Sequence, residues 1–451
     1  MARTPPSPID AAAAAFRAGH LHEAARLLAG ANRSSPAHAY LSGLVGLRLG
    51  RIEDAIRDLR QAVRHRPGVA AVHIALATAL RESGDAVSAI AACAHAVALA
   101  PGHALAQLER GLALRALGRL VEAQHAFGSA LACDPALSAA QEALAEALLL
   151  AGDMAAGAAC FFAYQQADRG WMARLAVPRM PTRVENGASV ILVADSGYGD
   201  TIQFLRYAQS LAARGCRVMV ECQPGLVDLA RMAPGVAAVL ASGNARPPHD
   251  VVLTMHSLLH VCGLSNSMVQ PYLTAPPSRA VGVLGAIMAR PPGTRAVGVV
   301  WAGDPRGRDD RQRSPGLTAV ASLIGLPGIH VFGLQVGAGR GDLTDRSMPP
   351  GFTDLGPQLA DFADTAAAMA ALDLIVTSDT AAAHLAGALG RLTWLMLPFV
   401  PSWRWGMDGA GTPWYPTMRL FRQTGPGDWA GVVARMRAAL MAWSAADIAV
   451  R

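Results

Sequence analysis

The stretch GDAVSAIAACAHAVALAP, Gly84 to Pro101, decides the fold of the first part of the chain. It opens with a glycine, carries alanines five and twelve positions later, and ends with a proline seventeen positions later. Four such glycines are spaced 34 residues apart, and a fifth precedes the first of them by 31 residues. The recurring positions are the glycines Gly19, Gly50, Gly84, Gly118 and Gly152, the small residues Ala24, Ala55, Ala89, Ala123 and Gly157, the alanines Ala31, Ala62, Ala96 and Ala130, and the prolines Pro36, Pro67, Pro101 and Pro135.

Each feature of this pattern has a physical role in a pair of packed helices. Small residues let two helices approach closely, a glycine makes the tight turn between them, and a proline ends the second helix. The pattern resembles the tetratricopeptide repeat, a helix-turn-helix unit of this period. We expect four or five units from about Ala11 to Tyr164, stacked as an α-solenoid with a concave face. Such an array is a general protein-interaction scaffold, so it does not specify a function by itself.

The bulk properties describe a large folded protein. A chain of 451 residues exceeds one ordinary core, and its length suggests about three domains. Hydrophobic residues make up 52% and charged residues 16%, which argues against disorder. No apolar run reaches the roughly 18 residues of a transmembrane helix, and MARTPPSPID at the N-terminus is unlike a signal peptide. We therefore expect a cytoplasmic protein without a transmembrane segment.

The cysteines form no C-x-x-C pair, so we expect buried, reduced thiols rather than a zinc site or a disulfide framework. They are Cys93, Cys133, Cys160, Cys216, Cys222 and Cys262.

The charges point to a small anionic ligand. Residues 1–168 contain 14 arginines and 14 acidic residues, whereas the remaining residues contain 25 and 19, so the net charge of +6 belongs to the second part. A modest surplus of this size suits an anionic small molecule better than a nucleic acid. All 39 basic residues are arginine. The absence of lysine excludes a Walker-A lysine and a Schiff base, so phosphate binding would rest on arginines, helix N-termini and backbone N–H groups.

Beyond the repeats, short apolar runs alternate with helical patterns, which is typical of a parallel sheet covered by helices on both faces. One set of runs comprises SVILVAD, CRVMVEC, AAVLAS and DVVLTM, and a second comprises RAVGVVWAG, IHVFGLQVG, LDLIVTS and LTWLMLP. Two doubly wound, Rossmann-like domains facing a cleft are therefore expected. The expected boundaries are 9–168 for the repeat array, 169–187 for a linker, 188–290 and 291–425 for the two Rossmann-like domains, and 426–451 for a C-terminal helix.

Ligands of open parallel sheets bind at the carboxyl ends of the strands, so the loops that follow the strands are candidate sites. The first is ADSGYGDTIQF, Ala194 to Phe204, where glycines permit close approach of the backbone and Asp200 stands near the start of a helix. Asp200 is either a helix N-cap or a general base that projects into the cleft.

The second candidate loop is WAGDPRGRDDRQRS, Trp301 to Ser314. It is either a solvated loop or a diphosphate site, because clustered guanidinium groups beside Gly303 at a strand end match the oxygens of a diphosphate. The run is too short, and too poor in aromatic residues, for nucleic acid. Its arginines are Arg306, Arg308, Arg311 and Arg313.

The third candidate is LDLIVTSDTAAAHLAGALG, Leu372 to Gly390. The sequence DTAAA also occurs upstream, where Asp364 does not follow a strand and is interpreted as a helix cap only. In the second copy Asp379 follows a strand directly, so Asp379, Thr380 and the helix N-terminus are expected at the cleft. His384 lies four residues after Thr380 and shares its helical face. It is either a core histidine or part of the site.

The fourth candidate is a Gly- and Pro-rich loop that carries several of the few aromatic residues of the chain. These side chains either stack on a base or sugar or fill the interior of the loop. They are Trp403, Trp405, Trp414 and Tyr415.

Taken together, these pieces resemble the heptosyltransferase-like glycosyltransferases of family 9, in the bacterial group that carries an N-terminal tetratricopeptide array. The matching pieces are GYGDTIQFLRY, VGVVWAGDP, DDRQRS, DTAAAMAALDLIVTSDTAAAHLAGALG, WLMLP and PWYPTMRLFRQ, in order between Val190 and Gln423. The architecture is also similar to that of the O-linked N-acetylglucosamine transferases. The resemblance implies a GT-B fold and metal-independent, inverting transfer of a sugar from a nucleotide-diphosphate donor, with no cofactor.

The resemblance also implies roles for individual residues. Asp200 would be the base that deprotonates the acceptor hydroxyl. Donor binding would involve Gly303, Arg311, Arg313, Gln335, Ser378, Asp379, Thr380 and His384. The acceptor side or its loops would involve Gly199, Thr201, Gln203, Trp403, Trp414 and Tyr415. No metal ligand is expected, since the chain has no D-x-D motif.

Two hypotheses follow for the whole chain. The first is a glycosyltransferase whose repeat array recruits a protein or lipid-linked acceptor, with no nucleic-acid partner. The second is a non-catalytic scaffold or chaperone-like interaction protein with a degenerate transferase domain. Binding of a nucleotide sugar separates the two.

Overall fold

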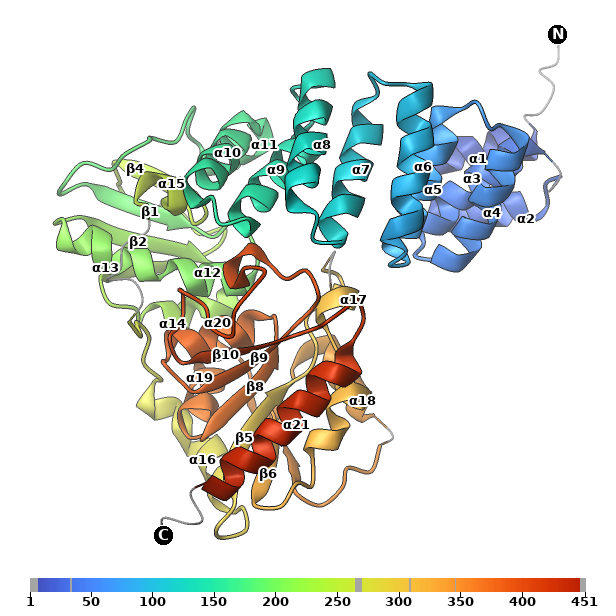
Figure 1. Ribbon diagram of the computed structural model, residues 1–451. Helices are drawn as coiled ribbons and strands as arrows, with labels where there is room; N and C mark the ends of the chain where they lie inside the picture. Colours follow the sequence, from blue (N-terminus) through green and yellow to red (C-terminus); the bar gives the residue numbers. More distant parts are fainter. Residues whose placement is uncertain (1–6, 33–34, 264–269, 308–309, 345, 447–451) are drawn as a thin grey trace. The chain divides into compact units, whose positions relative to one another are not determined.

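The computed structural model describes residues 7–32, 35–263, 270–307, 310–344 and 346–446 (Figure 1). The chain divides into two compact units, residues 1–148 and 149–451. The first is a helical repeat unit and the second is an α/β unit. Each is described by itself below.

The repeat unit consists of successive antiparallel helix pairs. The turn between the helices of each pair contains one of the periodic glycines in the left-handed region, for example Gly50 at φ 72° and Gly84 at φ 91°. Only glycine adopts this conformation without strain, so the predicted turns are confirmed. The helices are α1 (Pro8–Arg17), α2 (Leu21–Ala29), α3 (Pro36–Arg48), α4 (Ile52–His65), α5 (Ala70–Glu82), α6 (Ala86–Leu99), α7 (Ala104–Ala116), α8 (Leu120–Cys133) and α9 (Ser138–Leu150), the last of which ends just inside the second unit.

Small residues lie where the paired helices touch. Ala55, Ala89 and Ala123 are fully buried, as the repeat pattern predicts. In α7 there is no room for any side chain at Gly111, where an added Cβ would lie 2.4 Å from the ring of Phe127.

The prolines of the pattern have two different positions relative to the helices. Pro67, Pro101 and Pro135 follow helix ends, as expected, because a proline cannot donate the backbone hydrogen bond that would continue the helix. Pro36 differs, because it is the first residue of α3 rather than the end of α2. Proline suits the first helical position, whose N–H has no partner within the helix.

Replacing Gly111 with alanine should destabilise the repeat unit by about 1–3 kcal/mol, because the buried ring of Phe127 would have to move. Gly128→Ala is the matched control, since Gly128 lies in the exposed part of α8 with nothing within 4 Å of an added Cβ. That control should gain about 0.5–1 kcal/mol from helix propensity. Urea unfolding followed by circular dichroism measures both, and equal midpoints for the two variants would contradict the packing argument.

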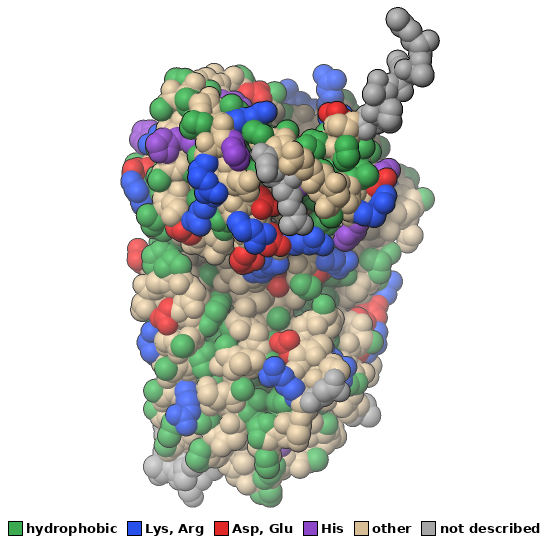
Figure 2. Space-filling model, turned by 90° about the vertical axis from the view of Figure 1, so that its right-hand side faces the viewer, with side chains coloured by type: hydrophobic (Ala, Val, Ile, Leu, Met, Phe, Trp, Pro, Cys, Tyr) green, Lys and Arg blue, Asp and Glu red, His purple; other side chains and the backbone are tan. Residues whose placement is uncertain are grey.

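The repeat unit carries acidic and basic side chains side by side. In the view of Figure 2, basic side chains (blue) and acidic side chains (red) are intermixed on the surface. On α4, for instance, Arg57 pairs with Asp54 at 2.8 Å. This mixture agrees with the equal numbers of arginines and acidic residues in the first 168 residues.

The first sheet of the α/β unit has four parallel strands in the order β3-β2-β1-β4. All four coincide with predicted strands. They are β1 (Ser189–Val193), β2 (Arg217–Cys222), β3 (Val236–Ala241) and β4 (Val251–Thr254). The helices of this part are α10 (Met154–Ala167), α11 (Arg169–Leu175), α12 (Tyr198–Phe204), α13 (Arg206–Ala213), α14 (Val227–Ala230) and α15 (Leu258–Val261).

The second sheet has six parallel strands in the order β10-β9-β8-β5-β6-β7. Its core contains Trp301, Trp394 and Phe421, with residues of the last helix packed against them (red in Figure 1). The strands are β5 (Arg295–Val300), β6 (Ile329–Gly333), β7 (Phe352–Asp354), β8 (Leu374–Ser378), β9 (Thr393–Leu397) and β10 (Met418–Arg422). The helices are α16 (Ala280–Met288), α17 (Asp310–Arg313), α18 (Gly316–Val320), α19 (Phe362–Ala370), α20 (Ala381–Ala388) and α21 (Trp429–Ala446).

The sequence patterns did not identify every element. Strands β7 and β10, which were not expected, are the two edge strands of the second sheet. β7 is only three residues long, and β10 contains two arginines. Helix α11 begins the segment that was expected as a linker. A single helix was expected from Thr201 to Arg214, but the chain forms α12 and α13 there.

In both sheets the strand order reverses once, and each reversal marks a crevice at the carboxyl ends of two strands. In the first sheet it falls between β1 and β4, and in the second between β5 and β8. The residues that follow these four strands are therefore the ones to inspect for a site.

The six cysteines are all free thiols, but only half of them are buried. Cys93, Cys216 and Cys222 are buried, whereas Cys133 is exposed near the end of α8, contrary to expectation. None of the helices among the described residues is both long and apolar enough to cross a membrane.

Candidate functional site

Asp200 lies in the first turn of α12 rather than at its N-cap position, and its two carboxylate oxygens have different partners. Helix α12 begins after Gly197, and Asp200 is its third residue. One carboxylate oxygen, Oδ2, accepts a hydrogen bond from the backbone N–H of Gly197 at 3.0 Å, so Asp200 caps the helix from within its first turn. The other oxygen, Oδ1, accepts a hydrogen bond from Nη2 of Arg404. The capping role therefore leaves the second oxygen available for the site.

Arg404 lies in the short 3-10 helix Trp403–Trp405 that follows β9, and its guanidinium is the central cation of the site. It donates to Asp200 and to Oε1 of Gln203, and its Nη1 donates to Ser402 Oγ at 3.1 Å. Its guanidinium carbon lies 4.3 Å from the ring centre of Trp403. With only 8% of its surface exposed, Arg404 is held by oxygens on one side and an aromatic face on the other.

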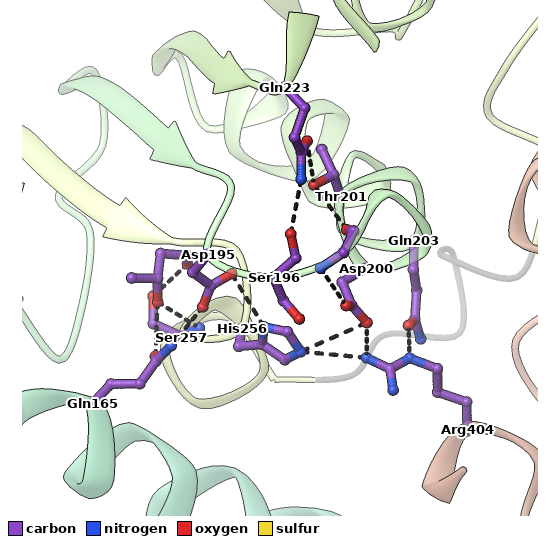
Figure 3. A network of polar contacts seen from close by, with 12 residues as sticks. Gln165, Asp195, Ser196, Asp200, Thr201, Gln203, Gln223, His256, Ser257 and Arg404 are labelled. Carbon is purple, nitrogen blue, oxygen red and sulfur yellow. Dashed lines mark hydrogen bonds and ion pairs between the residues drawn. The ribbon is translucent and has the colours of Figure 1, made fainter. Parts of the chain in front are cut away.

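His256 and Asp195 form a second polar pair at the reversal point of the first sheet (Figure 3). Asp195 comes two residues after β1, and His256 comes two residues after β4. His256 Nδ1 lies 3.1 Å from Oδ1 of Asp195, and its Nε2 lies 3.8 Å from Oδ1 of Asp200. Gln165 of α10 donates its side-chain N–H to Oδ2 of Asp195. Figure 3 shows these side chains in one continuous row that ends at Arg404.

The charges in this row shift the pKa values of both titrating groups. Burial alone would raise the pKa of Asp200, but Arg404 and His256 beside it hold that pKa well below its usual range. Burial alone would lower the pKa of His256, but the carboxylates of Asp195 and Asp200 raise it above its ordinary value. Asp200 is therefore a carboxylate at neutral pH, whereas the site favours the protonated form of His256 more than water does.

The expected donor-side residues partly converge at the reversal point of the second sheet. An added Cβ on Gly303 would lie 3.3 Å from Nη2 of Arg313 and 3.5 Å from Cγ2 of Thr380, so these three residues are neighbours. Asp379 is 6% exposed. Burial raises the pKa of Asp379, although Arg313 and Arg404 act on it in the opposite direction. Ser378 Oγ is buried without a hydrogen-bond partner among the described residues.

His384 connects this group to α12. Its Nδ1 lies 2.9 Å from the hydroxyl of Tyr415, and burial lowers its pKa to about 3, so the ring is neutral at physiological pH. An added Cβ on Gly199 would lie 2.7 Å from Cδ2 of His384. Glycine at position 199 is therefore what allows α12 to approach α20 so closely.

Neither aspartate of the two DTAAA copies is the N-cap residue of its helix, although Asp364 was expected to be a cap. Helix α19 begins one residue after Asp361, whose Oδ1 accepts from the N–H groups of Ala363 and Asp364, so Asp361 is the cap and Asp364 lies within the first turn. Helix α20 begins at Ala381 with Thr380, not Asp379, at the N-cap position. Asp379 is thereby placed in the loop directly after β8.

The aromatic residues of the fourth candidate loop are buried. Trp403 and Trp414 form an edge-to-face pair with ring centres 5.6 Å apart, and the guanidinium of Arg206 lies over both Trp414 and Tyr415. Their exposed fractions are 7%, 4% and 1% for Trp403, Trp414 and Tyr415. These contacts favour the packing alternative over an open stacking platform.

Other candidate residues hold loops in place. Gln335 Oε1 accepts from the backbone N–H groups of Trp301 and Ala302, which fixes the loop after β5. Thr201 donates to Gly197 O at 3.3 Å and to Gln223 Oε1 at 3.1 Å.

Two further arginines of the second candidate loop lie on its exposed surface. Arg311 is exposed, and Arg306 pairs with Asp304 in the same exposed segment. Arg308 lies outside the described residues.

Four residues of the site were not identified from the sequence. Asp195 and His256 each lie two residues after a strand, so the rule that ligands bind at strand ends would have found both. Arg404 and Gln165 carry no comparable signal, because they reach the site only through the folding of a long loop and of a helix from the repeat pattern.

A separate pocket of about 430 Å³ lies in the repeat unit, between helices α2, α3 and α4. Its wall combines apolar side chains with polar and charged ones. The polar residues among its lining are His38, Ser42, Arg51, Asp54, Arg57, Asp58 and Gln61.

Comparison with known proteins identifies the repeats. Residues 46–112 match the model of the tetratricopeptide repeat family, which confirms the expectation for the N-terminal region. No curated protein matches the chain. A thermophilic TPR protein from Thermus thermophilus is 22% identical, with a TM-score of 0.33 over 38% of this chain and 95% of that protein. MamA from Desulfovibrio magneticus is also 22% identical, with a TM-score of 0.33 over 36% of this chain and 94% of that one.

Proposed function

We propose that the α/β unit is a metal-independent, inverting glycosyltransferase of the GT-B type that uses a nucleotide-diphosphate sugar. The observation that carries the proposal is the ion pair between Asp200 and Arg404. Asp200 follows β1 of the first sheet, and Arg404 lies in the loop after β9 of the second. A carboxylate to engage an acceptor hydroxyl and a cation to meet a leaving diphosphate thus occupy one site. The resemblance of GYGDTIQFLRY and its companion pieces to family 9 glycosyltransferases supports the same reaction.

The donor side is assigned to the reversal point of the second sheet. Arg313 beside Gly303 would contact the diphosphate, and Thr380 at the N-terminus of α20 would place backbone N–H groups next to it. The neutral ring of His384 would offer a hydrogen bond without adding charge. In the reaction, the acceptor oxygen bonds to the anomeric carbon as the bond from that carbon to the diphosphate breaks.

The repeat unit is proposed to recruit the acceptor. Tetratricopeptide repeats suggest protein partners, and the pocket between α2, α3 and α4 offers hydrogen-bonding side chains of both charges. A polar peptide segment, or the headgroup of a lipid-linked acceptor, fits that lining.

The alternative is an interaction protein whose α/β unit does not turn over. Two observations favour it: Arg404 is already paired with Asp200, and the aromatic residues Trp403 and Trp414 are packed away from solvent. Donor binding separates the two functions.

A thermal-shift survey with nucleotide sugars tests the proposal. A donor present at about 100 times its dissociation constant should stabilise the protein by roughly 2.7 kcal/mol. Arg313→Gln should weaken that shift, because Arg313 lies beside Gly303, whereas Arg311→Gln is the matched control and should keep it. An unchanged melting temperature with every nucleotide sugar would leave the scaffold function as the answer.

A further inference from the structure

We propose that His256, oriented by Asp195, takes the proton of the acceptor hydroxyl, while Asp200 orients that hydroxyl. The inference rests on the glycosyl transfer proposed above and assigns one of its steps to specific atoms. It makes His256 a catalytic residue and makes Asp195 and Gln165 positioning residues.

The geometry follows the arrangement of a nucleophile, a base and an orienting group. Asp195 accepts the hydrogen of Nδ1 of His256 at 3.1 Å, so Nε2 carries the lone pair. That lone pair accepts a hydrogen bond from Nη2 of Arg404 at 3.3 Å, and Nε2 lies 3.8 Å from Oδ1 of Asp200. A hydroxyl hydrogen-bonded to Oδ1 of Asp200 would therefore lie within reach of Nε2. Asp195 is itself fixed by Gln165, whose other amide atom, Oε1, accepts from Thr254 Oγ1 at 2.8 Å.

The ring of His256 also packs against two aromatic rings. Phe161 of α10 and Phe204 of α12 each have their ring centre 4.9 Å from that of His256. The side chain of His256 is 10% exposed and that of Asp195 is 1% exposed. A buried imidazole with a fixed orientation suits proton transfer, because its geometry does not have to be rebuilt in each turnover.

Asp200 is poorly suited to keep a proton. Its Oδ2 is used by the N–H of Gly197, and its Oδ1 is paired with Arg404. Both contacts stabilise the carboxylate, so its pKa stays far below neutral pH. A general base works best when its pKa lies near the working pH, and histidine is the side chain whose ordinary pKa is nearest to it.

The step balances without a further reactant. As the acceptor oxygen bonds to the anomeric carbon, its proton passes to Nε2 of His256, and the nucleoside diphosphate leaves with the electron pair of the broken bond. The resulting imidazolium lies between the carboxylates of Asp195 and Asp200, which stabilise its charge, and Arg404 opposes it with Nη2 3.3 Å from Nε2. These are the charged groups that face His256, from the loop after β1, from α12 and from the 3-10 helix; α10 contributes Phe161, which is uncharged.

The test is the pH dependence of donor hydrolysis, in which water replaces the acceptor. The full chain is incubated with UDP-glucose, UDP-N-acetylglucosamine, GDP-mannose and ADP-heptose, and release of the nucleoside diphosphate is measured between pH 5 and 9. If His256 is the base, the rate rises with pH through a limb above about 6.5. Asp195→Asn removes the charge that raises the pKa of His256, so this limb should move to lower pH. A rate that is flat across this range would make Asp200 the base and overturn the inference.

Variants of His256 supply an independent result. His256→Ala should slow hydrolysis by about 100- to 10,000-fold, and added imidazole should restore part of the rate. His249→Asn is the matched control, since His249 is exposed and lies away from the site. Retention of the wild-type rate by His256→Ala, or loss that imidazole does not restore, would overturn the assignment.

The tautomer of His256 distinguishes this inference from the proposed function. Long-range ¹H–¹⁵N NMR of the full chain without any donor should show the proton on Nδ1 when the ring is neutral. A proton on Nε2 would overturn the inference even if donors are hydrolysed. If the wild type hydrolyses none of the four donors, the proposed function fails for those donors, and the assignment of His256 as its base fails with it.

Discussion

Arg404→Met is expected to lower the free energy of unfolding by about 3–5 kcal/mol at pH 7, because it removes the nearer of the two cationic partners of the Asp200 carboxylate in a largely buried site. Urea unfolding of the full chain measures this loss. The control is Arg306→Met, which removes an exposed ion pair with Asp304 and should change the midpoint little.

The loss should also depend on pH in a definite direction. The pKa of Asp200 is lowered in the folded protein, so its contribution is present above the unfolded pKa near 3.9 and disappears as the pH falls through the folded value. The difference between wild type and Arg404→Met should therefore shrink below about pH 4. It should also grow with pH above about 6, because the charge of Arg404 lowers the pKa of His256 and its removal lets the folded variant hold that proton to higher pH. In the double variant with Asp200→Asn, the cost of Arg404→Met should fall, since no carboxylate is left unpaired. An equal cost with and without the carboxylate would show that the two residues are not coupled.

Asp200→Asn is expected to reduce the turnover of a bound donor by about 100-fold or more, while the thermal shift caused by that donor persists. The substitution keeps the shape of the side chain but removes the charge that orients the acceptor hydroxyl. Measuring the release of nucleoside diphosphate and the donor-dependent melting shift on the same sample separates turnover from binding.

Asp304→Asn is the matched control for this substitution. Asp304 is an exposed carboxylate paired only with Arg306 of its own loop among the described residues, so both readouts should be unchanged. If Asp200→Asn turned over the donor at the wild-type rate, Asp200 would have no role beyond capping α12.

Most of the fold could be predicted because its signals are local and repeated. The glycines of the repeats adopt positive φ values that other residues avoid, so their spacing marks each turn. The central strands form continuous apolar runs because they are buried on both faces, as in LIVTS of β8. The edge strands β7 and β10 were missed because one is very short and the other contains two arginines, so neither has that apolar signature.

The predicted residues of the site lie in the loops and helix starts that follow recognised strands, although Asp195 and His256 meet the same condition and were not identified. Asp379 was found in this way, and so was Gly303. Arg404 was not, because its role depends on where a long loop folds back, and its neighbour Trp403 was interpreted without it. The repeated DTAAA shows the limit of a local signal: the first copy lies within α19, the second contains the start of α20, and only the tertiary structure places Asp379 next to the charges of Arg313 and Arg404.

Helix α10 determines where the chain can be truncated without disturbing the site. Its sequence continues the periodic pattern of the array, yet its contacts place it in the unit that begins at Leu149, and its Gln165 holds Asp195. A cut at residue 168, where the periodicity ends, would discard that amide together with Phe161 and leave the Asp195 carboxylate without its donor. The α/β unit therefore cannot be separated from the repeats at residue 168 without losing part of its site. Any transplant of a different array onto it must retain α10 or supply an equivalent amide.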